Sequence, residues 1–241
     1  MSINRLLAFS SSRVGSGGFL ETATPLIKTF LGNSFTEIAF IPFASVTKED
    51  EAYAAMVSDA LAALPCKIRL VQPDNATEVI AQAGAILVGG GNTFKLLHDI
   101  YEYKLLDIIR DQVNAGIPYI GWSAGSNITG PTIGTTNDMP VIQPKSFNAL
   151  GLLPFQLNPH YYNKPVEGHN GETRDQRLTE FLTLNPGVPV IGLPEGSALY
   201  LENDQLTFTG SCPGVLFTTD ADSGLLMRQE ITEGEDISFL L

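Results

Sequence analysis

The sequence predicts an α/β fold of three layers, in which helices cover both faces of a doubly wound, mainly parallel sheet. Three observations predict it. Apolar runs alternate with amphipathic stretches over the first two-thirds of the chain, glycine-rich turns follow two of these runs, and short β-type runs fill the last third. Apolar runs without polar alternation are typical of strands buried on both faces, and strand–helix alternation produces parallel sheets covered by helices.

Five buried strands are expected in the first two-thirds of the chain. They are Leu6–Ser10, Glu37–Pro42, Lys67–Val71, Ala85–Gly89 and Pro118–Trp122. The stretches between them predict helices over Phe19–Leu31, Thr47–Leu64, Phe94–Ile100 and Leu105–Val113. Pro25 must begin or kink the first helix, because proline lacks the N–H that a helix interior uses.

The second of these helices has the clearest pattern. Thr47 and Asp50 offer an N-cap signal at its start. Its apolar face is formed by Tyr53, Met56, Val57, Ala60, Leu61 and Leu64. Such a stripe is typical of a helix packed on the core.

The last third of the chain predicts β-hairpins that complete or flank the sheet. The short runs are Val190–Leu193, Ala198–Glu202, Gln205–Thr209 and Val215–Thr218. Before them, Thr135–Arg174 has little regular pattern, and long irregular stretches inside compact domains are usually functional loops. The chain shows no repeat or linker, and residues 1–241 are therefore expected to form a single domain.

Composition excludes several classes of partner. The net charge of −12 argues against nucleic acid and against an anionic membrane surface, since neither is attracted to a negative field. The chain has no apolar run of the ~18 residues that a membrane helix needs, and its N-terminal apolar stretch is too short for a signal peptide. A cytosolic location is expected, and the oligomeric state stays open, a homodimer included.

The most informative motif is Gly121-Trp122-Ser123-Ala124-Gly125, which directly follows a predicted strand. This G-x-S-x-G pattern puts a serine on a sharp strand-to-helix turn. A second turn, Gly89–Asn92, also follows a strand, and both lie at the carboxyl edge of the sheet, where ligands bind in such folds. We expect an oxyanion hole formed by the N–H of Ala124 and by Gly90 and Gly91. No Gly-Lys-Ser/Thr follows the glycines, which excludes a P-loop.

A serine hydroxyl needs a base, and the chain has three histidines. His98 lies in a predicted helix and suits packing, and His169 lies in a polar loop where it could touch substrate. His160 follows a predicted strand, Phe155–Leu157, and is the favoured base.

Asp138 and Glu195 compete to orient that histidine. Spacing cannot choose between them. Glu195, however, follows a strand and so belongs to the carboxyl edge of the sheet.

These motifs resemble peptidase E, the α-aspartyl dipeptidase family of serine peptidases. The resemblance covers residues 38–198 and rests on Gly89–Phe94, Gly121–Gly125, Thr135–Pro140, Asn158–His160 and Gly171–Arg174. It implies a fold similar to class I glutamine amidotransferases, with serine in place of their cysteine. It also implies hydrolysis of dipeptides and similar small compounds with an N-terminal aspartate, without metal or cofactor.

Residue by residue, the resemblance makes Ser123 the nucleophile and His160 the general base. It leans to Asp138 as the orienting acid, against the sheet-edge argument for Glu195, and both acids are kept.

An aspartate side chain requires a local cation in an acidic protein. Arg174, in the matched loop, is the best candidate, because a guanidinium can hold a carboxylate by two hydrogen bonds. Arg177 is a weaker candidate. His169 and Asn92 complete the expected substrate-binding residues.

Three alternatives compete with this interpretation. A cyanophycinase-like hydrolase would use the same residues on β-linked aspartyl chains in an open groove. A small-molecule binding module would keep the fold without the reaction, but the intact Ser123, His160 and both acids argue against it. A lipase-like hydrolase usually has its histidine near the C-terminus, whereas this chain has none after residue 169.

Overall fold

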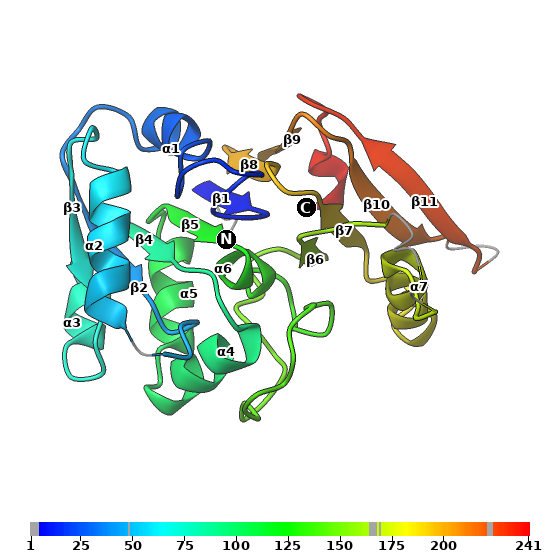
Figure 1. The fold of residues 1–241 in the computed structure, drawn as a ribbon, viewed down its shortest axis with the longest axis horizontal. Helices are drawn as coiled ribbons and strands as arrows, with labels where there is room; N and C mark the ends of the chain where they lie inside the picture. The colour runs from blue at the N-terminus through cyan, green and yellow to red at the C-terminus, as the bar shows by residue number, and fades with distance from the viewer. Residues whose placement is uncertain (1–4, 48, 164–167, 169, 221–223) are drawn as a thin grey trace.

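The computed structural model describes residues 5–47, 49–163, 168, 170–220 and 224–241. Its larger sheet has seven strands in the order β3-β2-β4-β5-β1-β8-β9 (Figure 1). These strands are β1 (Arg5–Phe9), β2 (Thr36–Ile41), β3 (Cys66–Leu70), β4 (Ala85–Val88), β5 (Tyr119–Trp122), β8 (Ala198–Glu202) and β9 (Gln205–Thr209). The first five are parallel, and β8 and β9 extend the sheet in antiparallel pairing. The mainly parallel sheet is confirmed.

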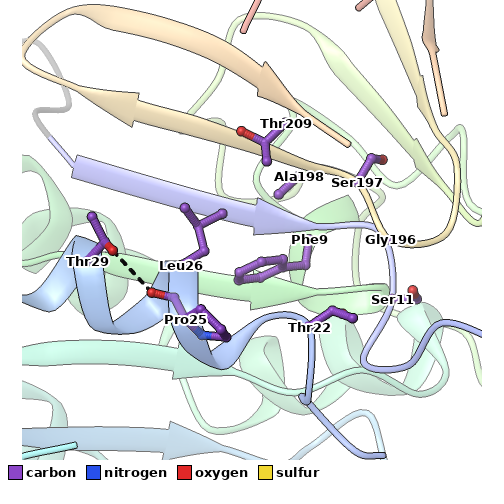
Figure 2. Close-up of a pocket in the computed structure, with 10 residues that line it drawn as sticks. All are labelled: Phe9, Ser11, Thr22, Pro25, Leu26, Thr29, Gly196, Ser197, Ala198 and Thr209. Carbon is purple, nitrogen blue, oxygen red and sulfur yellow. Dashed lines mark hydrogen bonds between the residues drawn. The ribbon is translucent and has the colours of Figure 1, made fainter. Parts of the chain in front are cut away.

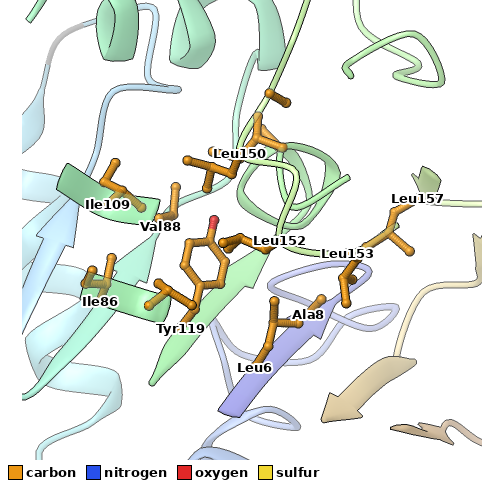
Figure 3. Packing of buried hydrophobic residues seen from close by; sticks show 14 of the residues in the cluster. Leu6, Ala8, Ile86, Val88, Ile109, Tyr119, Leu150, Leu152, Leu153 and Leu157 are labelled. Atoms are coloured by element: carbon orange, nitrogen blue, oxygen red, sulfur yellow. The ribbon is translucent and has the colours of Figure 1, made fainter. Parts of the chain in front are cut away.

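Helices cover both faces of this sheet, so the three-layer prediction is confirmed. One face packs against α1 (Thr24–Leu31) and α2 (Asp50–Ala60). The opposite face packs against α3 (Ala76–Ala81), α4 (Thr93–Glu102), α5 (Leu106–Asn114) and the single turn α6 (Ala124–Asn127). Side chains of β1 alternate between the two cores, with Leu7 and Phe9 on the first face and Leu6 and Ala8 on the second. Figure 3 shows Leu6 and Ala8 in the second core. This alternation follows from the period of two in a strand.

A second sheet of four strands, in the order β11-β10-β7-β6, stands beside the first (Figure 1). Its strands are β6 (Gln156–Pro159), β7 (Val190–Leu193), β10 (Gly214–Thr219) and β11 (Leu226–Ile231). Helix α7 (Arg174–Leu184) packs on it through Leu178 and Leu182. The described chain ends in a 3₁₀ turn, η1 (Ser238–Leu240).

The hairpin prediction for the last third is only partly right. The pairs β8–β9 and β10–β11 are antiparallel hairpins. Residues Val190–Leu193 instead pair in parallel with β6, which contains most of the predicted strand Phe155–Leu157 and extends it to Pro159. The reason is that pairing partners far apart in sequence leave no local signal in a run of four residues.

Helix boundaries differ from the sequence prediction in instructive ways. Helix α1 begins at Thr24, with Pro25 in its first turn, where a missing N–H costs nothing. The N-cap of α2 is Glu49 rather than Thr47, and no side chain caps it. Met56 is 43% exposed, so it does not belong to the buried stripe. Within the described part of the chain, no helix combines the length and apolar character needed to cross a membrane.

Candidate functional site

Ser123 lies between the end of β5 and the first turn of α6, in a backbone conformation that is rare for a residue with a side chain. Its φ is 52° and its ψ is −113°. Such strained backbone persists only where the surroundings enforce it. Here the Ser123 N–H donates to the Phe9 carbonyl at 3.1 Å, and the Ser123 carbonyl accepts the N–H groups of Ser126 and Asn127. The turn is therefore held from both sides.

The two glycines of the motif are required by close backbone contacts. A Cβ on Gly125 would lie 2.2 Å from the carbonyl oxygen of Val88, and one on Gly121 would lie 2.5 Å from the carbonyl oxygen of Gly125. Both distances are far inside van der Waals contact. The glycines thus let β5, α6 and β4 approach closely enough to raise the Ser123 side chain at the sheet edge.

The structure brings Ser123, His160 and Glu195 into one hydrogen-bonded line. The Nε2 atom of His160 lies 3.0 Å from Ser123 Oγ, and its Nδ1 atom lies 3.0 Å from Glu195 Oε1. Because an ionised carboxylate can only accept, Nδ1 carries the proton and Nε2 is left to accept from the serine hydroxyl. The side chains of His160 and Glu195 are 42% and 55% exposed, so water reaches this line.

His160 directly follows β6, and Glu195 lies two residues beyond β7. Both therefore come from the second sheet, whereas Ser123 comes from the first. His160 also has a positive φ of 54°. Its N–H donates to Ser10 Oγ at 2.9 Å, and the amide of Asn137 donates to the carbonyl of the preceding Pro159 at 2.7 Å. These bonds fix the turn that presents the imidazole.

Asp138, the rival acid, is placed differently. Its Oδ2 atom accepts the Thr93 N–H at 2.7 Å and the Thr136 hydroxyl at 3.2 Å. Thr93 is the first residue of α4, so the carboxylate sits at the positive end of that helix. Among the described contacts it makes no hydrogen bond to His160, although both residues line the same pocket.

The glycine turn after β4 packs against the serine turn. A Cβ on Gly90 would lie 2.8 Å from Trp122 Cδ1 and 3.0 Å from Ser123 Cβ. The Gly90 carbonyl accepts the Tyr53 hydroxyl at 3.1 Å, and that hydroxyl accepts the Trp122 indole N–H at 3.0 Å. Burial raises the pKa of Tyr53 to about 12, so the phenol stays a donor at neutral pH.

The orientation of the Gly90 carbonyl also fixes the next N–H. The Gly90 carbonyl and the Gly91 N–H belong to one trans peptide, in which they point in opposite directions. The Gly91 N–H is therefore turned away from Tyr53. Within the described part of the protein, neither this N–H nor that of Ala124 has a hydrogen-bond acceptor. Both are free to donate to a ligand.

A pocket of about 520 Å³ opens over these groups. Its lining comprises Ser11, Ser12, Arg13, Gly15, Tyr53, Gly90, Gly91, Trp122, Ser123, Asp138, His160 and Glu195. Another pocket, of about 290 Å³, lies beyond the Glu195 turn, between α1 and the β8–β9 hairpin (Figure 2). Ser11 lines both pockets.

Asn92 and Arg174, two of the expected substrate-binding residues, are not among the described residues that line that catalytic pocket. Asn92 caps α4 by accepting the Lys95 N–H at 3.0 Å, and its amide donates to the Met139 carbonyl at 2.8 Å. Its side chain is thus occupied by the protein. His169 lies outside the described residues. His98, which was set aside at the sequence level, is on α4 and contacts Asp99.

Arg174 is the first residue of α7 and does not line the pocket. Its Nε atom is buried without a hydrogen-bond partner among the described residues. Burial, and then the nearby Arg177, lower the pKa of its guanidinium. The neighbouring Asp175 is bonded to Tyr161, which follows His160 in the chain, and to Arg228.

The pocket residues that sequence reasoning missed include Tyr53 and Arg13. Tyr53 was assigned to a packing stripe, and its hydroxyl gave no separate signal. Arg13 follows the carboxyl end of β1, so the sheet-edge rule applied to Ser123 would have included it.

Comparison with known proteins places this geometry in a family context. The model of Peptidase family S51 matches residues 6–209. Peptidase E of Shewanella denitrificans is 48% identical over 242 residues and is covered completely, as is this chain. Peptidase E of Shewanella baltica (strain OS155) is 49% identical over 242 residues, covering 100% of this chain and 99% of the relative.

Two solved structures are similar in fold. One is a putative peptidase E protein from Listeria monocytogenes EGD-e, with a TM-score of 0.68 and 24% identity over 88% of this chain and 100% of its own. The other is a peptidase from an acI-B1 Actinobacterium, with a TM-score of 0.70 and 18% identity over 98% of this chain and 97% of its own. At these identities the likeness concerns the fold, and it supports the predicted fold class.

Proposed function

This chain belongs to peptidase family S51, the family of its peptidase E relatives, and we propose that it is a serine peptidase acting on small substrates with an N-terminal aspartate. The observation that carries the proposal is the line from Ser123 Oγ through the His160 imidazole to Glu195, with both hydrogen bonds at 3.0 Å. A serine, a base and an orienting acid in this order can activate a hydroxyl for attack on a carbonyl.

In the proposed mechanism, His160 Nε2 takes the proton of Ser123 as Oγ attacks the carbonyl carbon of the scissile peptide bond. The carbonyl oxygen becomes an oxyanion, which the free N–H groups of Gly91 and Ala124 stabilise. The imidazolium then gives its proton to the leaving amine, so the peptide bond breaks and an acyl-enzyme remains. A water molecule, deprotonated by His160, hydrolyses the ester and restores the serine.

Glu195 is the orienting acid in this proposal. Its carboxylate accepts from His160 Nδ1, holds the productive tautomer and stabilises the imidazolium that forms. Asp138 keeps a supporting role, because its carboxylate is committed to the start of α4. The glycine turn and the loop that carries Asp138 are thereby held together beside the serine.

The aspartate specificity is proposed from the family resemblance and from Arg174. This guanidinium makes no ion pair with any described residue, and its Nε lacks a partner, so it retains capacity for a carboxylate. It also lies beside Tyr161, the residue that follows His160.

The test is a panel of Asp-Leu, Asn-Leu, Glu-Leu and β-Asp-Leu with the purified protein and its Ser123→Ala and Arg174→Ala variants. We expect hydrolysis of Asp-Leu above the others, loss of at least 10³-fold in kcat for Ser123→Ala, and a raised KM for Arg174→Ala. Full activity of Ser123→Ala would remove the serine mechanism. Preferred hydrolysis of β-Asp-Leu would favour the cyanophycinase-like alternative, and an unchanged preference for Asp over Asn in Arg174→Ala would exclude its assigned role.

A further inference from the structure

Arg13 stands at the same sheet edge as Ser123, in the loop that follows β1, and it lines the catalytic pocket. Hydrogen bonds hold this loop in one conformation. The Ser11 hydroxyl donates to the Arg13 carbonyl at 2.7 Å, and the Leu20 N–H donates to the Ser12 carbonyl at 2.7 Å. The backbone that carries the guanidinium is therefore well fixed, although the side chain itself is exposed.

The guanidinium of Arg13 has no acidic partner among the described residues. Its Cζ atom instead lies 6.0 Å from the ring centroid of Phe19. That ring makes edge contacts with Trp122 and Tyr53, at centroid distances of 6.0 and 6.2 Å, and both of these rings line the pocket. An aromatic surface thus leads from the cation to the serine turn. A cation placed on it keeps all its N–H donors available.

The charges around the pocket require such a cation. The protein has a net charge of −12, and the pocket lining includes the carboxylates of Asp138 and Glu195. A dipeptide with an N-terminal aspartate carries two carboxylates, one on its side chain and one at its C-terminus. Arg13 is the only lysine or arginine among the described residues that line this pocket. Asp138 and Glu195 repel a substrate carboxylate that enters the pocket, and Arg13 opposes that repulsion.

We propose that Arg13 binds the free C-terminal carboxylate of a dipeptide, while the leaving residue packs against the aromatic surface of Phe19, Tyr53 and Trp122. This inference rests on the proposed function and deepens it. Arg174 is assigned to the other carboxylate, on the substrate's aspartate. A cation that binds this carboxylate favours substrates of two residues, because a longer peptide has an uncharged amide at that position. Peptide length is thereby selected by charge as well as by space.

The test separates the C-terminal charge from the rest of the substrate. Asp-Leu and Asp-Leu-amide are compared with the wild-type protein, Arg13→Gln and Arg13→Lys, and kcat/KM is measured for each. Arg13→Gln should lower kcat/KM for Asp-Leu about tenfold, mainly through KM, since charge-assisted hydrogen bonds at an exposed site are modest. Its effect on the amide should stay within twofold. Arg13→Lys should recover part of the loss, because it keeps the charge.

Lys67→Gln is the matched control, because it removes one positive charge from β3, an edge strand of the larger sheet that is separated from β1 by three strands. It should leave the ratio between acid and amide unchanged. Equal effects of Arg13→Gln on Asp-Leu and its amide, or none on either, would overturn the inference while leaving the peptidase proposal in place. A wild-type protein that hydrolyses neither compound would contradict the proposed function itself, and this inference with it.

Discussion

The two acids near the histidine can be separated by a pair of isosteric substitutions, Glu195→Gln and Asp138→Asn. Each removes one negative charge and keeps the size of the side chain. The structure predicts unequal effects, because Glu195 Oε1 lies 3.0 Å from His160 Nδ1, whereas Asp138 is bonded to the Thr93 N–H.

The expected loss of kcat on Glu195→Gln follows from the attraction between the Glu195 carboxylate and the His160 imidazolium that forms during the reaction. Two unit charges about 5 Å apart interact by roughly 3 kcal/mol at an effective dielectric constant of 20. The Glu195 side chain is 55% exposed, so screening by water reduces this value to about 2–3 kcal/mol. We therefore expect Glu195→Gln to lower kcat by roughly 10²-fold. A fully buried triad carboxylate is worth more, about 10⁴-fold.

The expected effect of Asp138→Asn follows from the position of this carboxylate at the start of α4. The amide oxygen of asparagine can still accept the Thr93 N–H, so only the interaction of the charge with the helix end is lost. That interaction is worth about 0.3–1 kcal/mol. Asp138→Asn should therefore lower the free energy of unfolding by this amount and change kcat less than threefold.

The assay is the initial rate of Asp-Leu hydrolysis at saturating substrate, with chemical denaturation of each variant as the control for folding. The reasoning would be refuted by a larger loss of kcat in Asp138→Asn than in Glu195→Gln when both variants remain folded. Such a result would move the orienting role to Asp138.

Two further predictions concern the backbone around the serine. Tyr53→Phe removes the hydroxyl that donates to the Gly90 carbonyl, so the Gly91 N–H loses its fixed direction. We expect kcat for Asp-Leu to fall about tenfold while KM stays within twofold. A change in KM alone would contradict this prediction. Gly125→Ala places a methyl group 2.2 Å from the Val88 carbonyl, and denaturation should give a free energy of unfolding lower by about 1–3 kcal/mol. An unchanged stability would mean that the turn relaxes freely.

The parts of the fold that sequence analysis predicted are those with local signals. The strand ending at Trp122 is a buried apolar run, and the glycines around Ser123 are dictated by contacts within the turn itself. The partner strands of the first sheet follow from strand–helix alternation, because helical connections make neighbours parallel. The first sheet can therefore be predicted from the sequence of each element and from the order of the elements along the chain.

The second sheet could not be predicted in the same way. β6 and β7 are four residues each, and α7 lies between them in the chain. Both runs were predicted as strands, but their pairing depends on contacts distant in sequence, which no local pattern reports. The choice between Asp138 and Glu195 was left open for this reason. Which acid reaches His160 depends on where β7 ends relative to β6, and the spacing of these residues in the sequence does not reveal that.

The hydrogen bonds of Ser10 explain how residues from two sheets meet with hydrogen-bond precision. Ser10 follows β1, at the centre of the first sheet, and is fully buried. Its hydroxyl donates to the Leu193 carbonyl at 2.8 Å and accepts the His160 N–H at 2.9 Å, while its own N–H donates to the Ser197 carbonyl at 2.9 Å. One residue thus joins the ends of β6 and β7 to the strand next to β5. Because buried groups that lose such partners cost about 1–3 kcal/mol each, the second sheet cannot shift relative to Ser123 without a large penalty. The hydrogen-bonded arrangement of Ser123, His160 and Glu195 therefore depends on the junction between the sheets rather than on either sheet alone.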